Sequence, residues 1–242
     1  MSKITLKSLI ADYRRDKLAE EVAGDWGSAL VYRPLAFVLA WPLARLRVPP
    51  TAVTLSGSLL LPAIVAIAVV VPTETAVPLV CMLGALFCVL DCVDGTLARA
   101  LRRESTFGYY TDLSSDLIYR PTIYAALGHL ADRLAGSAQS TTLAIALIAA
   151  WLALFARVAR LYGEKLLPQP PATAPPRPAV DASAIAAAFY TALSGMDTLL
   201  PLLALALWWL GALPVLFTWL VIYSAADAIY AQATTLWALR GV

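Results

Sequence analysis

The chain has 242 residues, of which 60% are hydrophobic and only 14% are charged, and its mean hydropathy is +0.74. Soluble domains are about half apolar and about a quarter charged, so this composition excludes an ordinary soluble enzyme. The net charge is only +2, which leaves no broad cationic surface that would favour nucleic acid as a partner. We therefore expect an all-α integral membrane protein.

The N-terminal region, residues 1–48, is predicted to lie on the cytosolic membrane surface. Charges interrupt residues 1–29, which is not typical of a signal peptide. Apolar residues from Leu6 to Tyr13 recur at helical spacing, as in an amphipathic interfacial helix, and Leu30–Leu46 predicts a second one. A soluble cap helix would fit the first segment equally well.

Residues 49–242 are predicted to form a catalytic domain of six transmembrane helices. Thr51–Val71 carries no charge and is long enough to cross a hydrocarbon core of roughly 30 Å. The later spans are predicted from Leu79 to a charged region at 99–104, then at 107–130, 141–162, 182–210 and 213–239.

Basic residues near the ends of the spans predict the orientation. They gather at the N-terminus and after the even-numbered spans, whereas the other side has only Arg133. Because Lys and Arg favour the cytoplasmic side, both termini are expected in the cytoplasm. The proline-rich segment 168–178 is predicted to be a stiff linker on that side.

Two pairs of carboxylates stand where the second span gives way to the third. Asp91 and Asp94 are three residues apart, so on a helix they share a face, about 4.5 Å apart along its axis. Asp112 and Asp116 are four residues apart and also share a face. The two pairs are expected at the same depth, because one helix leaves the membrane where the next re-enters it.

Four converging carboxylates cannot all stay ionised in a low-dielectric site without cations. All-oxygen ligands select hard ions such as Mg²⁺ or Mn²⁺, and two such ions about 3.5 to 4 Å apart support phosphoryl chemistry. The four aspartates are therefore predicted metal ligands, and a phosphate ester or anhydride is the expected substrate. The alternative is that they only pair with nearby arginines and hold helices together.

The residues beside these pairs suit a phosphate ligand. Gly95 and Ala98 leave room for a ligand or for a close helix, and Arg99 offers a permanent cation to a phosphate. Gly108 lies on the same face of the third span as the second carboxylate pair. Asp116 is the better placed candidate for a general base.

These residues resemble the D-x2-D-G-x2-A-R-x8-G-x3-D-x3-D signature of the class I CDP-alcohol phosphotransferase (CDP-alcohol phosphatidyltransferase) family, without a gap or a substitution. The eight matching positions are Asp91, Asp94, Gly95, Ala98, Arg99, Gly108, Asp112 and Asp116. The PTAVT segment at 50–54 resembles more weakly the PNxxT segment that opens the first span in that family, with Thr51 where Asn is usual.

The resemblance implies a six-helix membrane enzyme, commonly a homodimer, with a cytosol-facing site. It would transfer a substituted phosphate from a CDP-alcohol, usually CDP-diacylglycerol, to the hydroxyl of a small alcohol and release CMP, in phospholipid biosynthesis. By this likeness the four aspartates hold two Mg²⁺ or Mn²⁺ ions, and Asp116 also deprotonates the acceptor. The CDP pocket would be lined by Gly95, Ala98, Arg99 and Gly108.

The acceptor alcohol is not specified by these residues. Leu117 follows Asp116, whereas the glycerol-phosphate enzymes of the family show DPxxDK and the inositol-phosphate enzymes show Arg after the last Asp. Arg120, Arg157 and Arg160 are the candidate acceptor-binding residues. Anchoring to anionic headgroups is an equal alternative for the last two.

Two functions of other classes stay open. A carboxylate-lined cation transporter would usually place its site near the bilayer midplane on broken helices, whereas these aspartates stand at one membrane edge. An aspartate-rich prenyl transferase would also use metal and diphosphate.

Asp197 and Asp227, isolated in the fifth and sixth spans, predict a polar patch that could reach the acceptor.

Overall fold

The computed structural model describes residues 4–137, 139–166, 193 and 195–240, and every element assigned in them is helical. The N-terminal region contains α1 (Leu6–Asp16), α2 (Leu18–Gly24), a π-helical turn η1 (Ser28–Tyr32) and α3 (Arg33–Arg45). The remaining elements are α4 (Pro50–Ser58), α5 (Leu60–Val70), α6 (Thr73–Leu101), α7 (Thr106–Leu134), α8 (Thr141–Leu166), α10 (Leu200–Trp209) and α11 (Leu213–Arg240).

Four helical stretches are long and apolar enough to cross a membrane. They coincide with the predicted first, second, fourth and sixth spans, and are Pro50–Val70, Thr73–Leu101, Thr141–Gly163 and Leu213–Arg240. The predicted third span is the 29-residue α7, which is less apolar because it carries part of the carboxylate cluster. Of the predicted fifth span, the structure describes the short apolar α10 and a few residues before it. The predicted linker at 168–178 lies outside the described residues.

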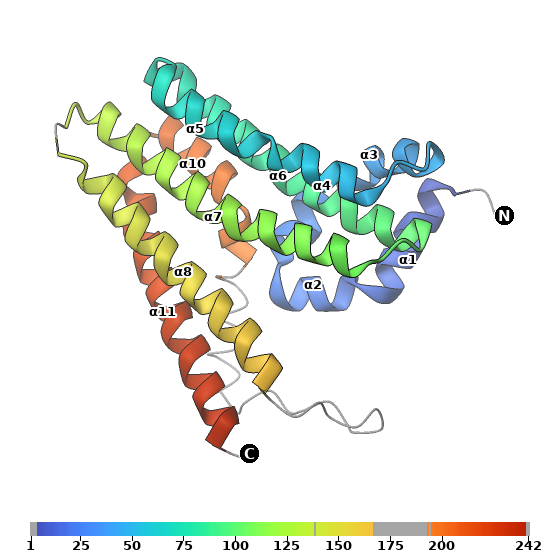
Figure 1. Ribbon diagram of the computed structural model, residues 1–242. Helices are drawn as coiled ribbons and strands as arrows, with labels where there is room; N and C mark the ends of the chain where they lie inside the picture. Colours follow the sequence, from blue (N-terminus) through green and yellow to red (C-terminus); the bar gives the residue numbers. More distant parts are fainter. Residues whose placement is uncertain (1–3, 138, 167–192, 194, 241–242) are drawn as a thin grey trace.

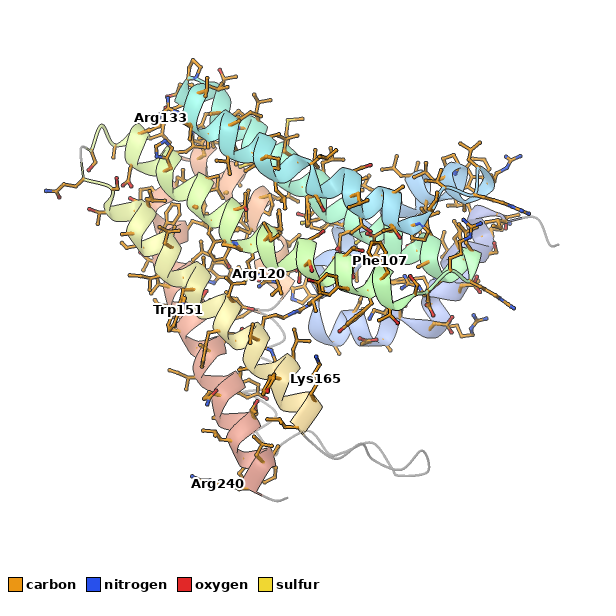
Figure 2. All side chains as sticks on the ribbon, in the orientation of Figure 1. Phe107, Arg120, Arg133, Trp151, Lys165 and Arg240 are labelled. Atoms are coloured by element: carbon orange, nitrogen blue, oxygen red, sulfur yellow. The ribbon has the colours of Figure 1, made fainter. Side chains whose placement is uncertain are left out.

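The helices form two arms that diverge from one end of the molecule (Figure 1). Helices α4 to α7 pack along one another in the first arm, and α8 packs along α11 in the second. We call the end where α6 passes to α7, at 102–105, the charged end, and the end where α7 passes to α8, at 135–140, the far end. Figure 2 shows Phe107 and Arg133 at these two ends of α7. The arms meet at the far end.

Polar side chains close the far end. The carboxylate of Asp132 accepts hydrogen bonds from the backbone N–H groups of Thr142 and Leu143, both at 2.9 Å, and so satisfies free donors at the start of α8. Arg133 donates to the carbonyl oxygens of Ala68 and Val71, at 2.7 and 3.0 Å, and so caps the end of α5. The single predicted basic residue on this side thus has a structural role.

The first span is not one straight helix. It is divided into α4 and α5 at Leu59. The hydroxyls of Ser56 and Ser58 donate to the carbonyl oxygens four residues earlier, at 2.7 and 3.0 Å. Such bonds compete with the backbone ladder and often bend helices, which explains the break that hydropathy alone did not predict.

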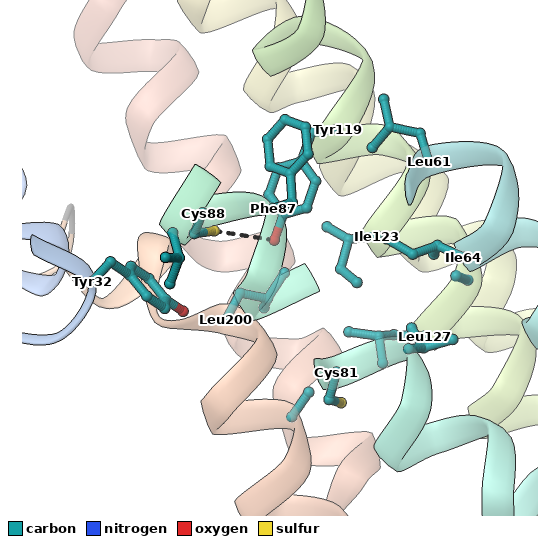
Figure 3. Close-up of a cluster of buried hydrophobic side chains, with 14 of the residues drawn as sticks. Tyr32, Leu61, Ile64, Cys81, Phe87, Cys88, Tyr119, Ile123, Leu127 and Leu200 are labelled. Atoms are coloured by element: carbon teal, nitrogen blue, oxygen red, sulfur yellow. Dashed lines mark hydrogen bonds between the residues drawn. The ribbon is translucent and has the colours of Figure 1, made fainter. Parts of the chain in front are cut away.

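The core of the first arm lies where α6, α7 and α10 meet (Figure 3). The rings of Phe87 and Tyr119 stack with their centroids 4.2 Å apart. The Tyr119 hydroxyl donates to the carbonyl oxygen of Gly84 at 3.1 Å and accepts from the thiol of Cys88 at 3.4 Å. This aromatic layer lies about one turn below the carboxylates on α6 and closes that side of the site.

The N-terminal region packs directly on the transmembrane helices. Helix α3 lies against α6 through Ala36, Ala40 and Ala44, which are fully buried and recur every four residues. Small residues at this spacing let two helices approach closely. The opposite face of α3 is apolar and exposed, with Leu35 and Val38 more than half exposed. This face suits contact with lipid.

Candidate active site

A cavity of about 550 Å³ lies between the N-terminal region and helices α6, α7 and α8. Its described lining contains eight carboxylates: Glu20, Glu21, Asp25, Asp91, Asp94, Asp112, Asp116 and Asp197. The basic side chains in it are five: Lys17, Arg33, Arg99, Arg120 and Arg157. If all were ionised, the lining would carry a formal charge of −3. The cavity therefore needs added cations before it can accept an anionic substrate.

Three of the predicted metal ligands meet in this cavity. One carboxylate oxygen from each of Asp91, Asp94 and Asp112 lies within 4.8 Å of the other two. Asp91 faces the open cavity, whereas Asp94 is buried at 5% exposure. Oxygens on opposite sides of a Mg²⁺ ion, with bonds of about 2.1 Å, stand about 4.2 Å apart. The donor set and its spacing thus fit a hard divalent cation.

Thr54 of α4 holds one of these ligands. Its hydroxyl donates to Oδ2 of Asp94 at 2.6 Å, and both side chains are buried. This is the threonine of the PTAVT segment. The bond fixes the direction of the Asp94 carboxylate, as hydrogen bonds to metal-binding side chains generally do.

The fourth aspartate stands apart from the cluster of three. Oδ2 of Asp116 lies 3.1 Å from a guanidinium nitrogen of Arg157 on α8, and this ion pair is partly exposed to the cavity. Among the described residues, Asp116 is therefore paired with an arginine rather than grouped with the other three carboxylates. The pair connects the two arms across the cavity.

Arg99 has an unsatisfied donor. Its Nη2 atom is buried and has no hydrogen-bond partner among the described residues, although Arg99 lines the cavity. A buried guanidinium nitrogen without a partner is costly unless a ligand supplies an acceptor. A Cβ atom placed on Gly95 would meet only the Arg99 guanidinium, at 3.6 Å and beyond. The missing side chain at Gly95 thus leaves space for a ligand, not for a close helix.

Two other predicted pocket residues, Ala98 and Gly108, are half-buried but are not among those that line the cavity. The backbone N–H of Gly108 donates to the Ser105 hydroxyl at 3.0 Å, which caps α7. A Cβ on Gly108 would lie 3.1 Å from that hydroxyl oxygen. The backbone of Gly108 is thus part of the cap that starts the helix bearing Asp112 and Asp116.

The three candidate acceptor residues pair with three different carboxylates, and Arg157 is the partner of Asp116. Arg120, at the middle of α7 (Figure 2), forms an ion pair with Asp197, which also accepts from the Tyr124 hydroxyl at 2.7 Å. Arg160 donates to both oxygens of Asp227, at 2.8 and 2.7 Å, and does not line the cavity. Asp197 and Asp227, predicted as one polar patch, are thus held by different arginines.

Residues of the N-terminal region line one side of the cavity, which the sequence analysis did not predict. Arg33 donates from Nε to both oxygens of Glu21, at 3.0 Å each, and from Nη1 to the carbonyl oxygen of Cys92 at 2.8 Å. Burial raises the pKa of the Asp25 carboxyl, which also accepts from the backbone of Ser28. A sequence pattern that could have indicated this polar lining is present, because Lys17, Glu21, Asp25 and Ser28 form a polar stripe at helical spacing.

The described residues define an all-helical membrane protein in which three aspartates are grouped in a cavity that Arg99 also lines. A family model described as CDP-alcohol phosphatidyltransferase matches residues 47–226, and the chain belongs to that family. This confirms the resemblance seen in the signature. The family transfers groups between a CDP-alcohol and an alcohol acceptor in membranes and is generally dependent on divalent metal. No curated protein matches the chain.

Proposed function

We propose that the protein transfers a phosphatidyl group from CDP-diacylglycerol to the hydroxyl of a small polar alcohol and releases CMP. The observation that carries the proposal is the single cavity in which the α6 and α7 carboxylates meet the unsatisfied guanidinium of Arg99. A volume of about 550 Å³ is in the range of sites that bind nucleotide-sized ligands.

Arg99 and Gly95 would bind the diphosphate of the donor. The Nη2 atom of Arg99 gains an acceptor when a phosphate oxygen enters, and Gly95 leaves room beside it. In the family signature Ala98 and Gly108 belong to the same CDP pocket. We retain that assignment as part of the proposal. Gly108 would contribute to it indirectly, through its place in the N-terminal cap of α7.

Asp91, Asp94, Asp112 and Asp116 would hold two Mg²⁺ or Mn²⁺ ions. When bound, such ions neutralise the diphosphate and the charge that develops on the departing CMP. The net negative lining of the cavity supports this part of the proposal, because a diphosphate would otherwise be repelled.

Asp116 would act as the general base. Its carboxylate takes the proton of the acceptor hydroxyl, and the alkoxide oxygen attacks the phosphorus that carries the diacylglycerol. The bond between this phosphorus and the bridging oxygen breaks, and that oxygen leaves with CMP. Arg157 lies 3.1 Å from the Asp116 carboxylate, so its guanidinium would also be close enough to bind an anionic or polar acceptor beside the base.

We place acceptor binding on Arg157 and Arg120, which line the cavity, with Asp197 orienting Arg120. Arg160 is bound by Asp227 outside the lining and would support α8 rather than touch the acceptor. The proposal includes six spans, a homodimer, and a site and termini on the cytoplasmic side. The length of α7 and its packing along α5, α6 and α8 support its place as a span.

An acceptor panel tests the proposed function. Purified protein in liposomes receives CDP-diacylglycerol, Mg²⁺ or Mn²⁺, and one of glycerol 3-phosphate, inositol, inositol phosphate, serine, choline or ethanolamine. We expect CMP release that needs both metal and one acceptor, with the lipid product identified by mass spectrometry. Cation flux without CMP release would support a transporter, and turnover of an isoprenoid diphosphate would support a prenyl transferase.

A further inference from the structure

A second, larger cavity lies at the charged end. It has a volume of about 950 Å³ and shares no described lining residue with the candidate active site. We call it the arginine groove. It is lined by Ile4, Thr5, Leu6, Trp41, Ala44, Arg45, Arg47, Ala100, Leu101, Arg102 and Arg103. The start of α1, the end of α3 and the end of α6 thus meet here.

The charge of the arginine groove is opposite to that of the active-site cavity. Its described lining contains four arginines and no carboxylate. All four side chains are exposed, so they do not hold the core together. Four guanidinium groups around one hollow favour a compact anion, and arginine binds phosphate oxygens through paired N–H donors.

Apart from Thr5, the rest of the lining is apolar, and its composition resembles that of a membrane interface. Trp41 is 39% exposed, and the guanidinium carbon of Arg45 lies 5.5 Å from the centroid of its ring. Leu46, between two of the arginines in sequence, is 75% exposed. Tryptophan and arginine beside exposed leucine are typical of the level where headgroups meet hydrocarbon. A ligand here would have an anionic head and an apolar body.

The backbone at two of the arginines is costly. Arg47 and Arg102 have φ angles of 55° and 52°, and they are the two non-glycine residues with positive φ in the part of the chain that the structure describes. Each lies at the C-terminal end of a helix, where glycine is usual because the left-handed conformation is sterically costly for other residues. Arg103 donates to the Arg47 carbonyl oxygen at 3.4 Å and joins the two turns. A ligand for these side chains would account for arginine at both positions.

We propose that the arginine groove binds the phosphate headgroup of an anionic phospholipid from the surrounding membrane. The phosphate lies among the four guanidinium groups, and the hydrocarbon lies along Trp41 and Leu101. The site is separate from the candidate active site, and the proposal does not depend on the proposed function.

Lipid retention measured by native mass spectrometry tests this site. Purified protein in neutral detergent is titrated with phosphatidylglycerol or phosphatidylcholine. The wild type is expected to prefer phosphatidylglycerol. An Arg45→Gln/Arg102→Gln variant should bind it about 25-fold more weakly, since each arginine near an anionic surface is worth about fivefold. An unchanged melting temperature in the same detergent checks that the variant is folded.

Matched variants decide where the lipid binds. Arg14→Gln/Lys165→Gln removes the same charge from exposed positions outside the groove and should change phosphatidylglycerol binding less than twofold. Arg99→Gln should also retain it, because Arg99 lines the other cavity. The proposal is overturned by equal binding of the two lipids, by equal loss in the matched variants, or by a loss on Arg99→Gln. Displacement of the lipid by millimolar inorganic phosphate would assign the groove to a soluble anion instead.

Discussion

At the scale of single residues, the bond between Thr54 and Asp94 connects the first span to the predicted metal site. A buried hydroxyl that donates to a carboxylate at 2.6 Å orients the ligand before any cation arrives. Thr54→Val has nearly the same shape but no donor. We expect it to lower the affinity for Mg²⁺ or Mn²⁺ about 10- to 100-fold, measured as the metal concentration that gives half-maximal CMP release.

Thr54→Ser is the matched control, because it keeps the hydroxyl and loses only a methyl group. It should bind metal within a few-fold of the wild type. If Thr54→Val and Thr54→Ser weakened metal binding equally, the effect would come from helix packing, and the role given to the hydrogen bond would be wrong.

The unsatisfied donor of Arg99 gives a prediction about nucleotide binding. Arg99→Gln removes the cation and its paired donors from the cavity wall. A hydrogen bond to a charged group contributes about 1.5 to 3 kcal/mol, so CDP should bind about 10- to 150-fold more weakly. Titration calorimetry with CDP and Mg²⁺ measures this. Lys165→Gln, exposed on the last turn of α8 (Figure 2), should leave CDP affinity unchanged, and equal affinities for both variants would contradict the assignment.

Much of the candidate site was predictable from residue spacing. Asp91 and Asp94 share a face of α6, and Asp112 meets them because α7 turns back at 102–105. Helical periodicity predicts the shared face, and the charged break between two spans predicts the reversal of the chain. The partners of Asp116 and Asp197 were not predictable, because Arg157 and Arg120 reach them across helices whose packing the sequence does not specify.

At the scale of elements, the N-terminal region is part of the site rather than an attached cap. The Glu21–Arg33 ion pair is buried, with side chains 9% and 8% exposed, and Tyr13 donates to the same carboxylate at 2.8 Å. Arg33 also donates to the hydroxyl of Thr96 at 3.2 Å, two residues after Asp94 on α6. Hydropathy could not predict this packing, because the pattern of α1 fits a membrane surface and a protein surface equally well.

This ion pair predicts a coupling between the N-terminal region and α6. Arg33→Met leaves the Glu21 carboxylate buried without its cation, which should cost about 3 kcal/mol and lower the melting temperature in detergent by several degrees. Glu21→Met should have a similar effect. The double variant should be destabilised by much less than the sum, because no unpaired charge remains. Additive losses would show that the two side chains do not stabilise each other.

At the scale of the whole molecule, residues from both arms and from the N-terminal region line one cavity between the diverging helices. The chain is an integral membrane protein of its family, and the distribution of its basic residues predicts the orientation that we propose. The break in the first span and the share of each helix facing lipid were not predictable from composition. The break depends on hydrogen bonds from side-chain hydroxyls of α4 to its own backbone carbonyl oxygens. The share of a helix that faces lipid depends on packing such as that of the α3 alanines against α6.

The orientation predicts which loops are reachable from each side. The three natural cysteines are buried, so a cysteine-specific, membrane-impermeant reagent should label new cysteines selectively. Glu104→Cys at the charged end should react only from the cytoplasmic side. Gln139→Cys at the far end should react only from the opposite side. Labelling of both from one side would contradict the proposed orientation.

The central claim is that the carboxylates gathered by α6 and α7 hold the cations on which CMP release depends. The most direct measurement is CMP release from CDP-diacylglycerol and a working acceptor, against Mg²⁺ or Mn²⁺ concentration, for the wild type, Asp91→Asn and the exposed control Glu104→Gln. The wild type and control should require metal, and Asp91→Asn should be slower by about a hundredfold or more at any metal concentration. Release without metal, or normal release by Asp91→Asn, would contradict the account.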